Sequence, residues 1–296
     1  MTETTVTAQD GTALRAEILG GAGPTVVLAH GWALGMPTWD FIARTLAERG
    51  MRVVRYDQRG HGGSAPGDLS KLSLSQLGMD LAAVVEQLGE GRVVIAAHSM
   101  GGMSAMSMAR QRPDLFDSAV TGLALISTSA GELKDVGLLL PRPLRPIAAR
   151  SIAPVMAQVH TRTRDKTRGV LVRVADRLTR RSTFGAAADA AQVAAARQLI
   201  AATDPSVILS CSHAMAVHDE IAALPHLRKI DVRVLVGSRD VLTPLAHAQR
   251  VAHEAGARLV VVPGAGHMLH LEAPDVVLDA VTSLVEAHSD ALRVDA

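Results

Sequence analysis

The sequence is poor in cysteine and in net charge, and each shortage excludes a class of protein. Its 30 basic and 29 acidic residues leave a formal charge of +1 at pH 7, so the overall charge predicts no nucleic-acid partner. The single cysteine, Cys211, excludes an internal disulfide and fits a reducing compartment. No histidine is spaced from Cys211 as in a metal site, so we expect no metal there.

Long apolar runs are missing as well. No run approaches the ~18–20 residues that a membrane-spanning helix needs. Residues 1–10 are polar and lack the basic and apolar regions of a secretory signal. We therefore expect a cytoplasmic location.

What the sequence does contain is a regular alternation of short apolar runs and amphipathic stretches. Its 296 residues suffice for one large domain plus an insertion. The first two runs, joined through Asp10-Gly11, predict an antiparallel hairpin, and the rest predicts a mostly parallel central sheet with helices on both faces. The expected strands are 4–8, 13–19, 25–29, 52–56, 92–97, 122–127, 232–237 and 258–262. Helices are expected at 39–49 with Thr38 as N-cap, at 74–88, at 101–110, from Pro244 with Thr243 as N-cap, and from Pro274.

The alternation stops after residue 128 and resumes near residue 230. We interpret residues 1–128 and 230–296 as an α/β core, and residues 129–229 as an inserted helical cap, or lid. Within the cap, the three prolines of 138–146 predict an irregular entry. Helices are predicted around 170–178, 186–202 and 205–217.

The most informative motif is Ala97-His98-Ser99-Met100-Gly101, which directly follows a buried run. A serine at the apex of a sharp strand-to-helix turn has a strained backbone and needs small residues two positions before and after it. Ala97 and Gly101 meet this requirement, with alanine in place of the first glycine of G-x-S-x-G. The pattern predicts that Ser99 is a nucleophile, and the alternative is a tight structural turn. Methionines at 103–108 are expected to pack behind Ser99.

A serine hydroxyl needs a base to take its proton and a carboxylate to orient that base, in this architecture in the order Ser, Asp or Glu, His. Asp240 and His267 each lie shortly after an apolar run, just past the carboxyl end of a predicted strand. Open parallel sheets form their sites at those ends, so we predict Asp240 as orienting acid and His267 as general base. His270 is a competing base, but it lacks the glycine-flanked position of His267.

The strand 25–29 leads into the turn His30-Gly31-Trp32-Ala33-Leu34-Gly35, whose glycines leave backbone N–H groups free. A tetrahedral intermediate carries negative charge and needs such donors in fixed positions. We predict an oxyanion hole formed by the backbone N–H groups of Trp32 and Met100.

Other polar residues near these motifs have simpler interpretations. His98 is expected to pack beside the nucleophile, Asp57 and Arg59 are expected to brace a loop, and His61 has no assigned task. Elsewhere, His213 and His218 are five residues apart, which is a poor spacing for two metal ligands on one helix face.

Together, these segments resemble the α/β-hydrolase superfamily. The matching pieces span residues 30–267 and are His30-Gly31-Trp32, Tyr56–Ser64, Ala97–Gly101, Gly237–Asp240 and Gly264–His267. The resemblance implies the same roles for Ser99, Asp240 and His267, an oxyanion hole at Trp32 and Met100, and no cofactor. Alanine at the first elbow position also occurs in some lipase-like members.

The implied reaction is cleavage of a carboxylic ester or thioester through an acyl-enzyme on Ser99. Members that open epoxides or displace halides use an aspartate nucleophile, and the epoxide-opening ones also use cap tyrosines, whereas the only tyrosine here is Tyr56 in the core. Cofactor-free perhydrolases, also called non-haem haloperoxidases, and carbon–carbon bond hydrolases share the triad and stay open as alternatives. Outside enzymes, the alternative is a hydrolase-fold receptor that binds a ligand without turnover.

The composition of the cap bears on the substrate. Residues 129–229 hold one aromatic residue, Phe184, so we expect a small-molecule substrate with an aliphatic, lipid-like acyl group, bound by the cap and the turn at residues 30–35. Residues 133–229 hold fifteen Lys and Arg against seven Asp and Glu. This excess either attracts anionic groups, such as phospholipid headgroups or the phosphates of coenzyme A, or forms solvated helix faces and salt bridges. The residues in question are Arg162, Arg164, Lys166, Arg168, Arg180 and Arg181.

Overall fold

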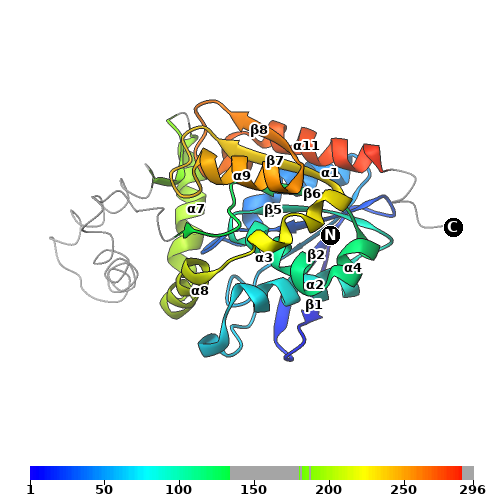
Figure 1. The fold of residues 1–296 in the computed structure, drawn as a ribbon. Coiled ribbons are helices and arrows are strands. Elements are labelled where there is room, and N and C mark those ends of the chain that lie inside the picture. Colours follow the sequence, from blue (N-terminus) through cyan, green and yellow to red (C-terminus); the bar gives the residue numbers. More distant parts are fainter. Residues whose placement is uncertain (134–179, 181, 187, 289–296) are drawn as a thin grey trace, which may run out of the picture.

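One eight-stranded sheet organises the chain (Figure 1). The computed structural model describes residues 1–133, 180, 182–186 and 188–288. The strands lie in the order β1-β2-β4-β3-β5-β6-β7-β8. Their bounds are β1 Thr2–Thr7, β2 Ala13–Leu19, β3 Thr25–Ala29, β4 Arg52–Tyr56, β5 Val93–His98, β6 Val120–Ile126, β7 Asp231–Gly237 and β8 Arg258–Val262.

The sheet is antiparallel at one edge and parallel elsewhere. β1 pairs with β2 and β2 with β4 in antiparallel register, and every other neighbouring pair is parallel. The central strands β3, β4, β5 and β6 are buried along their whole length, as expected for parallel strands covered on both faces. The predicted hairpin and mostly parallel sheet are confirmed.

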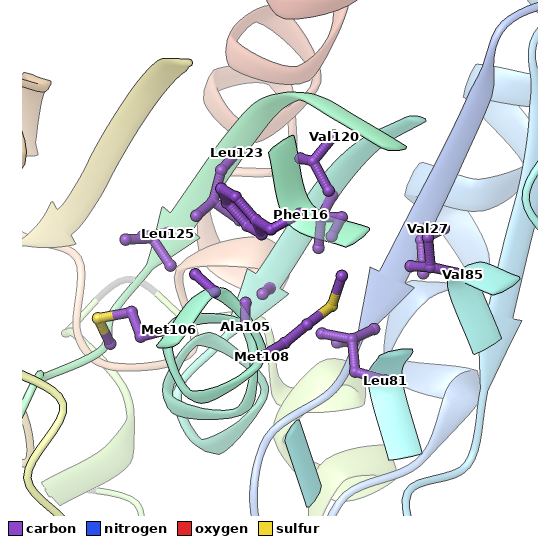
Figure 2. Close-up of a cluster of buried hydrophobic side chains, with 14 of the residues drawn as sticks. Val27, Leu81, Val85, Ala105, Met106, Met108, Phe116, Val120, Leu123 and Leu125 are labelled. Atoms are coloured by element: carbon purple, nitrogen blue, oxygen red, sulfur yellow. The ribbon is translucent and has the colours of Figure 1, made fainter. Parts of the chain in front are cut away.

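Helices cover both faces of the sheet, as predicted. On one face α2, α3, α4 and α9 enclose an apolar cluster that includes Met106 and Met108 of α3, Phe116 of α4 and Leu123 of β6 (Figure 2). On the other face α1 and α11 pack around Trp39 and Leu46. The helix bounds are α1 Asp40–Glu48, α2 Leu74–Leu88, α3 Met100–Gln111, α4 Pro113–Ala119, α7 Ala190–Ala202, α8 Pro205–Val217, α9 Leu245–Ala255, α10 Leu269–Glu272 and α11 Pro274–Ala287.

Two predicted helix caps are wrong. Thr38 is not the N-cap of α1, because a short 3-10 helix, η1 (Met36–Trp39), precedes it and the Thr38 hydroxyl donates to Gly35 O. Thr243 is not the N-cap of α9 either, because its hydroxyl donates to Asp240 and the cap position falls on Pro244.

The described part of 129–229 contains two helices that end at the same residues as predicted. Asp189 caps α7, which begins four residues later than predicted, and Asp204 caps α8 with Pro205 at its first turn. The predictions for 138–146 and 170–178 lie outside the described residues, as do five of the six basic residues, all except Arg180. The division into a core and a cap at residues 129–229 stays a prediction.

The chain enters and leaves this region at one place. Gly131 and Asp219 form an antiparallel bridge, and the N–H of Glu220 donates to Ala130 O at 2.7 Å. The two ends of the segment therefore lie side by side at the end of β6. Within the described residues, every helix is too short or too polar to cross a membrane.

Candidate active site

Ser99 lies in the sharp turn between β5 and α3. Its φ of 52° and ψ of −115° are unusual for a residue with a side chain and indicate local strain. Two hydrogen bonds hold this conformation: the Ser99 N–H donates to Ile126 O at 2.9 Å, and the Thr128 hydroxyl donates to Ser99 O at 2.7 Å. The loop after β6 thus fixes the serine backbone from the side.

Close packing explains the small residues around the serine. A Cβ atom on Gly101 would lie 2.6 Å from Ala29 O, so only glycine lets α3 approach β3 this closely. Ala97, by contrast, sits inside the sheet with Ala29 and Leu125 as its neighbours in the adjacent strands. An alanine methyl group is therefore accommodated where the usual motif has glycine.

The structure brings together the three residues that the sequence places 141 and 27 positions apart. His267 Nε2 lies 3.0 Å from Ser99 Oγ, and His267 Nδ1 lies 2.9 Å from Asp240 Oδ2. All three side chains are buried. A histidine with its Nδ1–H on a carboxylate presents the Nε2 lone pair to the serine hydroxyl, as a general base requires.

Asp240 is held as an ionised carboxylate. Its Oδ1 accepts the N–H groups of Leu242 and Thr243, each at 2.9 Å, and its Oδ2 accepts the Thr243 hydroxyl at 2.8 Å. Burial alone would raise the pKa of Asp240, but the charge interaction with His267 and these hydrogen bonds outweigh burial and lower the pKa.

The loop that carries His267 depends on residues that the sequence did not single out. The N–H groups of His267 and Met268 both donate to Thr183 O, at 2.8 and 3.0 Å. The Glu272 carboxylate accepts the N–H of Gly266 at 3.1 Å and that of Gly185 at 2.6 Å. Segment 183–185, from the predicted cap, therefore helps to place the loop that carries His267, and no local pattern indicates this.

The predicted oxyanion donors lie on either side of the serine turn. Met100 is the first residue of α3, and Trp32 follows Gly31, whose backbone packs against Ser99: a Cβ on Gly31 would lie 3.2 Å from Ser99 Cβ. Within the described part of the chain, neither backbone N–H donates to a protein acceptor. The Trp32 indole N–H donates to Ile208 O of α8 at 3.2 Å, which joins this turn to the predicted cap.

A model of the alpha/beta hydrolase family matches residues 26–280, which is most of the chain. The chain belongs to this family. It is 28% identical over 281 residues to the sn-1-specific diacylglycerol lipase ABHD11 of Mus musculus, which covers 88% of this chain and 81% of that protein. A shorter match, 40% identical over 97 residues, covers 33% of this chain and 35% of a non-heme haloperoxidase of Rhodococcus erythropolis. The solved structure of a thermophilic esterase from Thermogutta terrifontis aligns with a TM-score of 0.74 at 25% identity, over 98% of this chain and 100% of that chain.

In this alpha/beta hydrolase, His98 and His270 pack against each other rather than face the Ser99 hydroxyl. His98 Nε2 donates to the backbone oxygen of His267 at 3.0 Å, and its ring lies 4.2 Å from that of His270. Burial lowers the pKa of His98 well below its ordinary value and that of His270 to about 3, so both rings are neutral. The prediction that His98 packs beside the nucleophile is confirmed, and it also anchors the backbone of His267.

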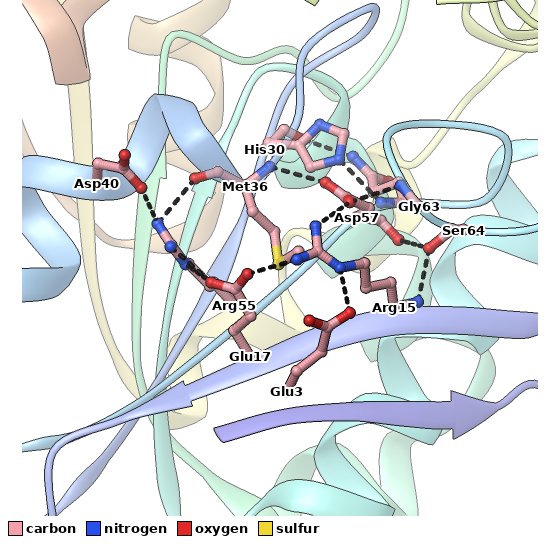
Figure 3. Close-up of polar contacts among 11 residues, drawn as sticks. Glu3, Arg15, Glu17, His30, Met36, Asp40, Arg55, Asp57, Gly63 and Ser64 are labelled. Atoms are coloured by element: carbon pink, nitrogen blue, oxygen red, sulfur yellow. Dashed lines mark hydrogen bonds and ion pairs between the residues drawn. The ribbon is translucent and has the colours of Figure 1, made fainter. Parts of the chain in front are cut away.

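Asp57 and Arg59 brace the loop after β4, as predicted. Asp57 accepts the N–H of Met36 and that of Gly63, each at 2.9 Å, so it joins the end of the turn at residues 30–35 to the loop after β4 (Figure 3). Arg59 is fully buried and pairs with Asp80 and Asp10, each at 2.7 Å.

In the described residues of this hydrolase, no group of three His, Cys, Asp or Glu side chains could hold a metal ion. His218 instead points its ring nitrogens at Met215 O and Ser129 O, at 2.6 and 3.2 Å.

Proposed function

We propose that this protein is a serine hydrolase that cleaves carboxylic esters or thioesters with aliphatic, lipid-like acyl groups. The observation that carries the proposal is the hydrogen-bonded series from Ser99 Oγ through His267 to Asp240, at 3.0 and 2.9 Å, with the serine on a strained turn. Membership of the alpha/beta hydrolase family agrees with it.

The reaction follows from these contacts. His267 Nε2 takes the Ser99 proton as Oγ attacks the acyl carbonyl, and Asp240 stabilises the imidazolium that forms. The N–H groups of Trp32 and Met100 receive the oxyanion. His267 then returns the proton to the leaving alcohol or thiol, and the same residues activate water to release the acid from Ser99.

Apolar side chains beside the nucleophile support an aliphatic acyl group. Met100 and Met103 of α3 pack with Leu77 of α2 and with Val207 and Cys211 of α8. Aliphatic and sulfur-containing side chains of this kind adapt to flexible chains. One relative is named a diacylglycerol lipase, and diacylglycerol is a lipid ester.

Labelling with a fluorophosphonate, followed by mapping of the modified residue, tests the nucleophile. We expect the label on Ser99 and no label on Ser99→Ala. A label elsewhere, or turnover of esters by Ser99→Ala at the wild-type rate, contradicts the assignment. Absence of any ester turnover in the wild type would favour a ligand-binding receptor.

A series of aliphatic esters and thioesters of increasing chain length, run beside aryl esters, tests the substrate class. We expect kcat/KM to rise with acyl length and to exceed that of the aryl esters. Equal rates across the series would contradict an aliphatic, lipid-like preference.

Perhydrolysis is the second candidate, because the chain is 40% identical over 97 residues to a relative named a non-heme haloperoxidase. In that reaction hydrogen peroxide replaces water in attack on the acyl-enzyme. Peracid formation in the presence of peroxide and a short carboxylic acid or its ester tests it. Peracid formation faster than ester hydrolysis would favour this second candidate.

The basic excess of the predicted cap adds a weaker proposal of peripheral contact with anionic lipid. Sedimentation with vesicles of anionic lipid, compared with neutral ones, tests it directly.

A further inference from the structure

The turn that carries Trp32 adopts a conformation that its sequence does not favour. The N–H of Leu34 donates to Gly31 O at 3.3 Å, which closes a β-turn with Trp32 and Ala33 as central residues. Ala33 has a φ of 56°, whereas turns with a positive φ at this position usually have glycine there. For alanine the left-handed region costs about 1–2 kcal/mol. A contact outside the turn is needed to favour this conformation.

His61 supplies that contact from the loop after β4. The N–H of Ala33 donates to His61 Nε2 at 3.0 Å, and His61 Nδ1–H donates to Arg59 O at 3.0 Å. The bond to Arg59 fixes the tautomer, so Nε2 carries the lone pair. Burial, assisted by His30, lowers the pKa of His61 to about 4, which keeps the ring neutral at pH 7 and able to accept.

The contact acts on the central peptide of the turn. Turns with a negative and a positive φ at the third residue differ by a flip of the peptide between the two central residues, here Trp32 and Ala33. Rotation of that peptide would move the Ala33 N–H away from His61 Nε2. His61 therefore favours one of two turn conformations.

The preceding peptide is held in a matching way. His30 Nδ1–H donates to Gly31 O at 2.7 Å, and the Gln58 N–H donates to His30 Nε2 at 2.8 Å. In a trans peptide the C=O and the following N–H point in opposite directions. Anchoring Gly31 O thus sets the direction of the Trp32 N–H, provided that the turn keeps its conformation.

We propose that His61 is a positioning residue for the oxyanion hole: by accepting the Ala33 N–H it holds the turn in the conformation that aims the Trp32 N–H at the reacting carbonyl. The expected effect on kcat rests on the proposed hydrolase function. The structural consequence, a protected Ala33 N–H, is independent of any activity.

Two variants of similar chemistry and different reach test the proposal. The side-chain amide of glutamine reaches as far as His Nε2, whereas that of asparagine reaches only as far as Nδ1. In His61→Gln we expect kcat within about threefold of wild type. In His61→Asn we expect kcat to fall about 10- to 100-fold with KM nearly unchanged, because loss of a whole oxyanion donor costs about 10²–10³.

Ser64→Ala is the matched control. Ser64 lies in the same loop, and its hydroxyl donates to Asp57 O at 2.6 Å and accepts the Arg15 N–H at 2.8 Å, without touching the turn at 31–34. We expect Ser64→Ala to lower the melting temperature with little change in kcat. Equal kcat values for His61→Gln and His61→Asn, or an equal loss in Ser64→Ala, would overturn the proposal.

Two further measurements keep the test decisive. Ala33→Gly removes the cost of the positive φ, so we expect it to restore part of the activity lost in His61→Asn; no recovery contradicts the proposal. Hydrogen exchange of the Ala33 N–H should be slow in wild type and His61→Gln and faster in His61→Asn. If exchange follows this order but the wild type hydrolyses no ester, the proposed function fails and the positioning of the turn stands.

Discussion

The described residues contain two serine–histidine contacts, and the shorter one does not involve the predicted nucleophile, Ser99. Ser99 Oγ lies 3.0 Å from His267 Nε2, whereas Ser129 Oγ lies 2.7 Å from His247 Nδ1. Both serines are buried, and both follow a central strand of the parallel sheet, β5 and β6. Distance and burial therefore do not distinguish them.

The partners of each pair do distinguish them. His267 is held by the Asp240 carboxylate, whereas no carboxylate in the described residues forms a hydrogen bond to the His247 ring. The Ser129 hydroxyl also donates to Gly131 O at 2.7 Å and accepts the Gly131 N–H at 3.2 Å. It therefore stabilises the turn at residues 129–131. A serine–histidine contact is a candidate catalytic pair when a carboxylate orients the histidine and the serine hydroxyl does not donate to a backbone carbonyl.

The largest effect should come from removing the Ser99 hydroxyl, and removing the Ser129 hydroxyl is the comparison. Ser99→Ala should lower ester turnover by about 10³-fold or more, because the nucleophile is lost. Ser129→Ala should leave kcat within about twofold of wild type. Steady-state hydrolysis of one aliphatic ester by both variants is the measurement, and a large loss in Ser129→Ala would show that the second contact takes part in the reaction.

Removing the charge of Asp240, which forms a hydrogen bond to His267 and none to His247, should have the next largest effect. Asp240→Asn should lower kcat by about 10²–10⁴-fold, because an amide does not hold His267 in the correct tautomer or stabilise its imidazolium. Glu132→Gln is the control and should leave kcat unchanged, because the charge of Glu132 acts on His247 and Glu132 accepts no hydrogen bond from His267. Hydrolysis rates at pH 8 compare the two variants, and similar rates would contradict the distinction drawn above.

Acid should lower the free energy of unfolding, because several buried histidines are neutral in the folded protein. Burial lowers the pKa of His30 and that of His61 to about 4, and burial also lowers the pKa of His247. The unfolded chain binds these protons near pH 6.5, so each neutral histidine stabilises the fold fully above pH 6.5, and this contribution falls as the pH drops toward 4. For His30 and His61 the loss extends over the range from pH 6.5 to about 4.

Urea unfolding at pH 7, 6 and 5 measures this slope. His61→Gln removes one titrating ring, so its unfolding free energy should fall less steeply with acid than that of wild type. Identical slopes for the two proteins would mean that His61 is not held neutral.

The smallest effect concerns the departure from the usual serine motif. Ala97→Gly should destabilise the fold by about 1 kcal/mol, through the loss of a buried methyl group and the extra backbone freedom of glycine. Turnover should be unchanged, because Ala97 lies inside the sheet between Ala29 and Leu125 and takes no part in the hydrogen bonds of Ser99. Thermal unfolding and ester hydrolysis of the one variant check both parts, and a gain in kcat would mean that the alanine restrains the nucleophile.

Much of the fold was predictable because apolar runs report burial directly. The strands at 13–19, 25–29, 52–56 and 258–262 begin and end as predicted, because each is a short, mainly apolar run bounded by turn residues. Helix α4 was missed although Pro113 and Asp114 are signals of a helix start. The N-cap of α1 was wrongly placed at Thr38, because the short 3-10 helix before α1 has no periodic apolar pattern in the sequence.

The candidate site was predictable where a residue lies in a strand-end motif, and not where a contact joins distant loops. Ser99, Asp240 and His267 each follow an apolar run, and the structure brings them together. His61 binds a turn 28 residues away, and Thr183 accepts hydrogen bonds from a loop 84 residues away. No local pattern carries such information.

The sequence by itself determined the fold class, the order serine, aspartate, histidine along the chain, and the small residues that a strained serine turn requires. These are local properties, because burial, backbone conformation and residue size are visible within a few positions. Only the tertiary structure decided which of two serines meets a histidine oriented by a carboxylate, and which conformation the turn at residues 30–35 adopts. The order of strands in the sheet sets these contacts, because it brings together the loops at the ends of β3, β4, β5, β7 and β8.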